Sequence, residues 1–258
     1  MKQQIRYVWE DLIRYKKRNI ILFIQIAVIL ILLSSIFSIL LDADDFQNKL
    51  DDFIKNQEEE IYYYYDISDE KRINEILGDK DNFDSLKELY DFIKKNSYIQ
   101  TFTADQSYNM WLSNNDIDIS FAVDPRSGPN EHFLLKIDDK FQNIFKLMPA
   151  KGRLFNNNDF TDEGNEIPLI LGFDFQGFYE LDDTIYDDMG TCYRIIGFLE
   201  KGSYYLSPIR GSEIFWLDRA FIIPIQLNKF IDPIDYDSVI NSTYIITDNS
   251  EDLYAIQA

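Results

Sequence analysis

The feature that most constrains this chain is an apolar run from Ile20 to Leu41, which contains no charged residue, no proline and no glycine. As an α-helix it extends roughly 33 Å, which is enough to cross a hydrocarbon core of about 30 Å. A cleaved signal peptide is the alternative, but its apolar region usually spans about 7–15 residues and ends at a small-residue cleavage site. This run is longer and ends without such a site. It therefore predicts a retained transmembrane helix over 19–41.

Charge is distributed unevenly on the two sides of this run. Residues 1–18 carry a net charge of +4, so the rest of the chain carries −24 to reach the overall −20. Because Lys16, Lys17 and Arg18 adjoin the apolar run, the positive-inside rule predicts a cell-membrane protein with a cytoplasmic N-terminus. Residues 42–258 then lie on the extracytoplasmic side. Their acidity argues against binding to nucleic acid and against adhesion to anionic lipid.

Segment 1–18 itself has the spacing of an amphipathic helix, with apolar residues on one face and basic residues elsewhere. Two interpretations stay open for it. The membrane helix either continues into the cytoplasm, or the segment lies in the membrane plane, where it can touch a cytoplasmic partner.

Polar residues interrupt the apolar run, and three of them bear on helix packing. Gln25 places an amide in hydrocarbon, where it needs a hydrogen-bond partner, and Ser34 and Ser38 have the small-residue spacing that lets helices approach closely. A serine hydroxyl can also bond back to its own helix. Taken together, the three residues predict packing against other membrane helices. No later window approaches eighteen apolar residues, so these helices belong to a second copy, to another chain or to a continuation of this one.

The outer part, 42–258, mixes predicted helices and strands without regular alternation, which favours the α+β class. Helices are predicted over 42–60 and 84–95, with short turns at 141–145 and 173–179 and a helix starting at 250. Strands are predicted over 61–65, 97–103, 117–123, 133–137, 167–171, 193–199, 215–225 and 242–247.

Catalytic and metal chemistry finds little support in the sequence. His132 is the only histidine, which excludes histidine-based zinc sites and triads, and its place beside a Pro/Gly loop predicts an exposed side chain. Cys192 is the only cysteine, so it cannot form an intramolecular disulfide and is predicted to be a small buried residue. The acidic segment 156–170 fails as a calcium loop because Ile170 occupies the last ligand position. We therefore predict no metal, no cofactor and no enzymatic activity.

Several stretches taken together resemble the MacB/FtsX-like family of ABC transporter permeases. Residues 11–19, running into the membrane helix, are similar to that family's N-terminal entry, and 148–155, MPAKGRLF, resembles its l-x-x-G-R-x-f stretch. The other matching stretches are IPLILG at 167–172, ELDDTI at 180–185 and YRIIGFL at 193–199. The motif positions are Gly152, Arg153, Gly172, Asp183 and Gly197, and Asp182 stands where the family pattern has glycine.

These motif residues are predicted to act structurally. Gly152 and Gly172 permit tight turns or close backbone approach, and Gly197 does the same within a strand. Arg153 is predicted to pair with one of the many acids.

The resemblance implies a periplasmic-core-type outer domain with two subdomains, one of them inserted over roughly 133–205. It also implies the N-terminal part of a permease subunit, driven by a separate cytoplasmic ABC ATPase and acting on antimicrobial peptides, lipid-linked molecules or toxic compounds. In the family further membrane helices follow the outer domain, so the end at Ala258 predicts a truncated permease. The alternative is a stand-alone single-pass binding or sensor protein, which Gln25 and the serine pair argue against.

Overall fold

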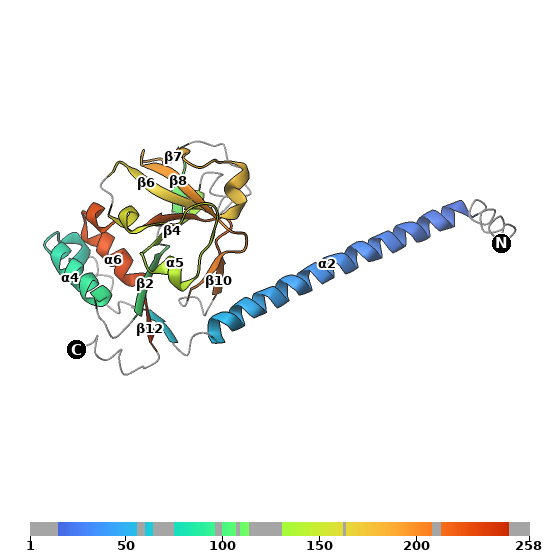
Figure 1. Cartoon of the computed structure of the whole chain (residues 1–258), viewed down its shortest axis with the longest axis horizontal. Helices are drawn as coiled ribbons and strands as arrows, with labels where there is room; N and C mark the ends of the chain where they lie inside the picture. The colour runs from blue at the N-terminus through green and yellow to red at the C-terminus, as the bar shows by residue number, and fades with distance from the viewer. Residues whose placement is uncertain are drawn as a thin grey trace. The chain divides into compact units, whose positions relative to one another are not determined.

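A computed structural model describes residues 15–55, 60–63, 75–95, 100–106, 109–113, 131–161, 164–207 and 213–247 (Figure 1). The chain divides into two compact units, Met1–Glu58 and Glu59–Ala258. The strand predicted at 117–123, the helix predicted from 250 and most of the amphipathic segment 1–18 lie outside the described residues.

The first unit is built on one continuous helix, α2 (Lys16–Lys55), of 40 residues. Its segment Phe23–Leu41 has a mean hydropathy of 2.7 and is long and apolar enough to cross a membrane, and none of it is buried against protein. The helix continues without a break past the apolar segment, which confirms the helix predicted from 42 onward as far as Lys55. A 40-residue helix is roughly 60 Å long.

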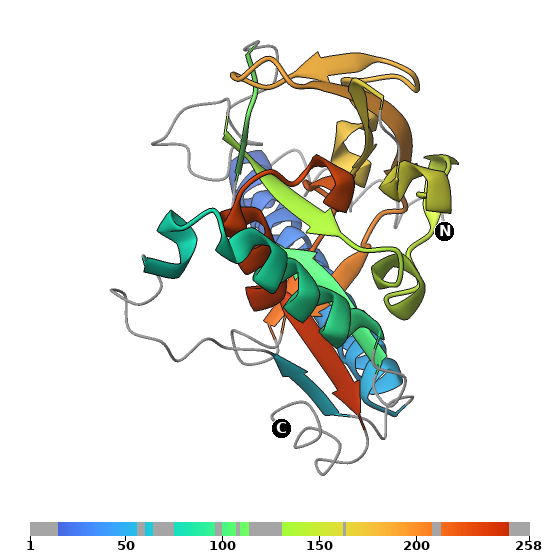
Figure 2. The same ribbon diagram turned by 90° about the vertical axis from the view of Figure 1, so that its left-hand side faces the viewer.

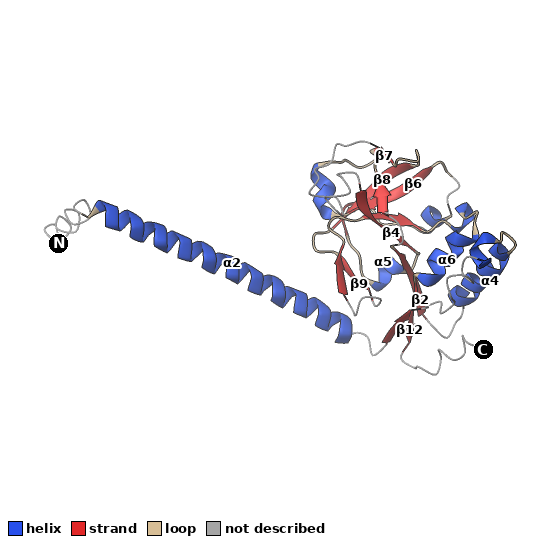
Figure 3. Ribbon diagram, turned by 180° about the vertical axis from the view of Figure 1, so that it is seen from behind, coloured by secondary structure: helices blue, strands red, loops and turns tan. Residues whose placement is uncertain are grey.

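The second unit contains a ten-stranded mixed sheet with the order β1-β12-β2-β4-β11-β6-β8-β5, to which β3 and β7 add at β4 and β8. Figure 3 shows these strands in red. The strands are β1 (Glu60–Tyr63), β2 (Gln100–Asp105), β3 (Asn109–Trp111), β4 (Glu131–Ile137), β5 (Pro149–Gly152), β6 (Glu166–Leu171), β7 (Thr184–Tyr186), β8 (Cys192–Leu199), β11 (Phe221–Pro224) and β12 (Thr243–Thr247). A separate hairpin joins β9 (Tyr204–Ser207) to β10 (Glu213–Trp216).

Two parallel pairs, β4 with β11 and β6 with β8, interrupt an otherwise antiparallel sheet. Strands β5, β6, β7 and β8 all come from the part of the chain between β4 and β11. The mixed sheet and its flanking helices confirm the predicted α+β class. The predicted division into subdomains, with an insert over 133–205, stays a prediction.

Helices cover strand β2 on both faces of the sheet. Helices α4 (Asn82–Lys95) and α6 (Pro233–Asn241) pack together on one face (Figures 1 and 2). Helix α5 (Phe141–Ile144) packs on the other, where Phe102 of β2 contacts Phe141. Because both faces are covered, β2 is buried along five successive residues. The described part of the unit also contains the short 3-10 helices η2 (Asn157–Phe160), η3 (Phe173–Gly177) and η5 (Leu227–Lys229).

Three sequence predictions are wrong in detail. The strand predicted over 215–225 is broken into β10 and β11 by a turn at 218–219. His132 is fully buried rather than exposed, because it is the second residue of β4 and its ring packs between Phe175 and Phe221. Cys192, the first residue of β8, is only partly buried.

Candidate functional site

Gln25, Ser34 and Ser38, the residues predicted to pack against other helices, all have exposed side chains in α2. At 3.6 residues per turn, Gln25 lies about half a turn around the helix from Ser34, while Ser38 follows Ser34 on the same face. Gln25 and the serine pair therefore lie on different faces of α2 and do not form one polar stripe. The neighbouring Ser35 donates to the Ile31 carbonyl of its own helix at 3.0 Å. Helix packing by these residues stays a prediction.

Within the second unit, the motif residues Gly152, Arg153 and Gly197 do come together. Strands β5 and β8 pair with Gly152 opposite Gly197, and the Arg153 amide donates to the Ile196 carbonyl at 3.0 Å. A Cβ on Gly197 would stand 2.3 Å from the Arg153 carbonyl oxygen, and one on Gly152 would stand 2.3 Å from that of Ile196. Gly152 also has a φ of +76°. Only glycine allows this approach of two backbones.

Gly172 serves a second close approach, where β6 ends. Its amide donates to the Ala220 carbonyl at 2.8 Å, and a Cβ there would stand 2.1 Å from the Leu217 carbonyl oxygen. The turn that precedes β11 thus lies directly against Gly172. The predicted role of this glycine in close backbone approach agrees with this geometry.

The Asp182-Asp183 turn places an aspartate in a backbone conformation suited to glycine. Asp182 has a φ of +67°, the left-handed conformation that glycine adopts freely. Its amide donates to the Ile195 carbonyl at 2.9 Å, and the Asp183 carboxylate accepts from the Glu180 amide at 2.8 Å. Asp182 thus occupies a conformation typical of glycine, and aspartate tolerates this conformation better than most residues do.

Arg153 pairs with Asp159 through both ends of its guanidinium group, with Nη1 at 2.5 Å from Oδ2 and Nη2 at 3.0 Å from Oδ1. The same carboxylate accepts from the Asn156 amide at 2.7 Å, which caps η2. The Asp159 carbonyl accepts from the Gln226 side chain at 2.8 Å, just before η5. Arg153 thus fixes the position of η2 through Asp159, and Gln226 ties η2 to the chain leaving β11.

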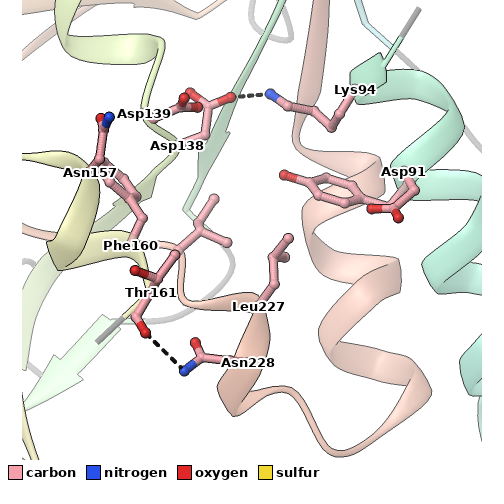
Figure 4. Close-up of a pocket in the computed structure, with 11 residues that line it drawn as sticks. Asp91, Lys94, Asp138, Asp139, Asn157, Phe160, Thr161, Leu227 and Asn228 are labelled. Carbon is pink, nitrogen blue, oxygen red and sulfur yellow. Dashed lines mark hydrogen bonds and ion pairs between the residues drawn. The ribbon is translucent and has the colours of Figure 1, made fainter. Parts of the chain in front are cut away.

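A pocket of about 520 Å³ opens between α4, the β4–α5 loop, η2 and η5 (Figure 4). Its apolar wall is formed by Phe160, Ile225 and Leu227 together with Tyr90 of α4. Its polar lining comes from Asp91, Lys94, Asp138, Asp139, Asn157, Thr161 and Asn228. A volume of this size is typical of small-molecule sites. No group of three or more His, Cys, Asp or Glu side chains in the described residues could hold a metal ion.

Asp138 is the most constrained polar residue of the pocket. It is 5% exposed and forms an ion pair with Lys94 of α4. Its carboxylate also accepts from the backbone amides of Thr103 and Phe141, each at 3.0 Å. Burial raises the pKa of the Asp138 carboxyl above its usual value, and Lys94 and the Phe141 amide oppose this shift. One side chain therefore connects α4, β2 and α5.

Tyr90 joins the same region to the sheet. Its hydroxyl lies 3.4 Å from Thr103 Oγ1, which lies 2.9 Å from Thr243 Oγ1 of β12. Burial raises the pKa of the Tyr90 phenol. Its ring lines the pocket, and its hydroxyl lies in a row of hydrogen-bonded threonine side chains.

The sequence indicated only part of this site. Tyr90 falls on the predicted inner face of helix 84–95, and it is buried there. Asp138 and Lys94 were not singled out, because they lie 44 residues apart and only the fold brings them together. The one local signal for Asp138 was an acid directly after an apolar strand and three residues before a helix start.

No protein-family model and no curated protein sequence matches this chain. Among solved structures, it is similar to the extracellular domain of the noncanonic ABC-type transporter YknZ from Gram-positive bacteria. The two share 15% identity at a TM-score of 0.41, over 76% of this chain and 86% of that one. It is also similar to the periplasmic region of MacB from Actinobacillus actinomycetemcomitans, with 17% identity and a TM-score of 0.42 over 76% and 78% of the two chains.

A third similar structure is a domain of a putative permease protein from Porphyromonas gingivalis, with 13% identity and a TM-score of 0.35 over 61% of this chain and 64% of that one. These are proteins of the kind that the sequence motifs resemble. With TM-scores below 0.5 they establish nothing about the function of this chain, which has to be argued from its own residues.

Proposed function

We propose that this chain is the N-terminal part of a permease subunit of an ABC transporter, with its second unit on the extracytoplasmic side of the cell membrane. The observation that carries the proposal is helix α2. It begins among basic residues, passes through an apolar segment of membrane-spanning length and continues unbroken to Lys55. A continuous helix transmits displacement along its axis better than an anchor joined to a flexible linker, because it has no interruption at which to bend.

Two further features support this reading. The residues that resemble the permease motifs occupy special positions, since Gly152 and Gly197 allow the paired strands β5 and β8 to approach closely and Arg153 fixes η2. The net charge of −24 beyond residue 18 disfavours attachment of the outer unit to an anionic lipid surface. A cytoplasmic ABC ATPase and further permease helices, from another chain or a second copy, are the partners that this function requires.

The orientation is tested by thiol labelling in intact cells. In a Cys192→Ser background, Met189→Cys places a thiol at a residue that is 86% exposed, and Lys17→Cys places one on the basic side of the apolar segment. We expect a membrane-impermeant maleimide to label Met189→Cys in intact cells and Lys17→Cys only after permeabilisation. The reverse pattern contradicts the proposed topology.

The partnership is tested by extracting the tagged full chain from membranes and identifying co-purified proteins by mass spectrometry. We expect an ABC ATPase, and we expect its recovery to fall when Gln25 and Ser34 are replaced by leucine. Ile29→Val is the matched control inside the same helix and should leave recovery unchanged. A chain that purifies without any ATPase would instead favour the stand-alone binding or sensor protein.

A further inference from the structure

The pocket between α4, η2 and η5 combines an apolar wall with a surplus of negative charge. Ile225 is 5% exposed, and it contributes to the wall together with Leu227 and the ring of Phe160. The rings of Tyr90 and Phe160 add aromatic surface, which attracts cations as well as apolar groups. The wall thus suits the body of an organic ligand, whereas a hydrated metal ion would gain nothing from it.

The charges of the pocket do not cancel. Three carboxylates and one ammonium group line it, and Lys94 is already paired with Asp138. Asp91 pairs with Lys95 at 2.8 Å on the exposed side of α4. Asp139 is exposed, and its side chain has no ion pair or hydrogen bond with any other residue that the structure describes. The carboxylate of Asp139 is therefore available to a ligand.

An anionic ligand would meet uncompensated repulsion from Asp139. A cationic ligand would meet attraction from the pocket and from a chain whose net charge is −20. We infer that this pocket binds a small organic cation, with an ammonium group at Asp139 and an apolar or aromatic body against Phe160, Ile225 and Leu227. Asn157 and Asn228 also line the pocket, and the Asn228 side chain donates to the Thr161 carbonyl at 3.5 Å (Figure 4).

Because several segments of the chain meet at the pocket, a ligand bound there would affect how these segments move relative to one another. Its walls belong to four segments that are held in place by Arg153–Asp159, Lys94–Asp138 and Gln226. A ligand that contacts α4 and η2 together would restrain these segments relative to one another. The inference goes beyond the proposed function, because a ligand site on the second unit does not depend on an ATPase partner, and either proposal can fail while the other stands.

The test uses three probes with nearly the same body and different charge: 2-phenylethylammonium, 2-phenylethanol and 3-phenylpropionate. Binding is measured by ligand-observed NMR on the full chain in phosphatidylcholine nanodiscs, with empty nanodiscs as the blank. We expect the ammonium probe to bind with a Kd of about 1 mM or below and at least about tenfold more tightly than the other two. Equal binding of the three probes, or no binding of the ammonium probe below about 20 mM, overturns the inference.

Two variants locate the binding. Asp139→Asn removes the available carboxylate from an exposed position. It should lower the affinity for the ammonium probe about threefold or more and leave the affinity for 2-phenylethanol unchanged. Asp188→Asn is the matched control, because Asp188 is an exposed acid in the β7–β8 turn, outside the pocket. Equal effects of the two variants would show unspecific attraction and overturn the site.

Leu227→Trp tests the apolar wall, since the larger side chain fills the space that the probe's ring would occupy. We expect it to abolish binding of both the ammonium and the alcohol probe. If this variant does not fold, the Asp139→Asn and Asp188→Asn pair still decides the inference.

Discussion

Two regions of the second unit are held together by different means. One is the close contact of the paired strands β5 and β8 at Gly152 and Gly197, called the crossing below, and the other is the pocket region between α4 and η2. At the crossing, two backbones touch at Gly152 and Gly197, and no side chain could be added without displacing one of them. Around the pocket, the segments stand further apart and are joined by side chains, above all by Asp138 and Asp159. The crossing therefore depends on the absence of side chains, whereas the pocket region depends on their hydrogen-bonding groups.

The largest effect is expected at the crossing. Gly197→Ala places a Cβ about 2.3 Å from the Arg153 carbonyl oxygen, so that β5 and β8 must separate. We expect the free energy of unfolding to fall on the order of 4 kcal/mol. Chemical denaturation of the full chain in detergent micelles, followed by near-ultraviolet circular dichroism, measures this change.

Two other glycines serve as controls for that substitution. A Cβ on Gly190 or Gly177 would meet no atom within 4 Å, and only Gly190 has a positive φ, of +84°. Gly190→Ala should therefore cost about 1 kcal/mol from backbone strain alone, and Gly177→Ala should be neutral within about 0.5 kcal/mol. Equal costs at all three positions would show that close approach of the backbones is not what stabilises the crossing.

A smaller effect is expected at Asp138. Asp138→Ala leaves Lys94 largely buried without its partner and deprives the amides of Thr103 and Phe141 of their acceptor. We expect a loss of about 3 kcal/mol in unfolding free energy near neutral pH. Asp139→Ala, one residue along the chain at an exposed position, should change it by less than about 0.5 kcal/mol.

The contribution of Asp138 also depends on pH. Because burial raises the pKa of this carboxyl in the folded chain above its usual 3.8, the folded state binds the proton more tightly than the unfolded state does. The contribution is fully present below pH 3.8 and falls as the pH rises through the raised pKa. The difference in unfolding free energy between wild type and Asp138→Asn should decrease over this window. A difference that increases with pH would show that Lys94 and the two amides outweigh burial.

The smallest effect is expected at Asp182, where the turn uses a side chain in a backbone conformation suited to glycine. Asp182→Gly relieves the strain of a φ of +67° but increases the freedom of the unfolded chain. We expect a net stabilisation between zero and about 1 kcal/mol. Asp182→Ala should be destabilising, because alanine lacks the short polar group that helps aspartate in this conformation. Thermal unfolding of the three chains in parallel should rank them Gly, Asp, Ala.

The sequence predicted the parts of the fold that local patterns determine. The apolar run gave the membrane-type helix, and the spacing of Leu86, Tyr90 and Ile93 gave α4, because periodic apolar residues bury one face. The run from Phe215 to Ile225 was predicted as one strand because all but two of its middle residues are apolar or small. In the structure the chain turns at Asp218-Arg219, and the backbone of this turn packs directly against Gly172.

The site could be predicted only where neighbours in sequence are neighbours in space. Arg153 and Asp159 are six residues apart, and their pairing follows from a short turn. Helix α6 was missed because acids interrupt its apolar spacing, although its Asp232-Pro233 start is a recognisable helix signal. The pocket could not be predicted at all, since its walls come from four segments and no local pattern records which segments the sheet order brings together.

The pairing of β1 with β12 has a mechanical consequence. These strands are antiparallel, and Glu60, where the described chain enters the sheet, lies opposite Thr247, where it leaves. A tension that pulls these two residues apart acts across the strands, along the direction of their hydrogen bonds. The force therefore acts on one pair of opposed residues at a time, and the two strands separate in sequence, starting from Glu60 and Thr247. Under a pull the second unit would thus yield first at this edge, while the β4–β11 pair and the pocket beside it remain unloaded.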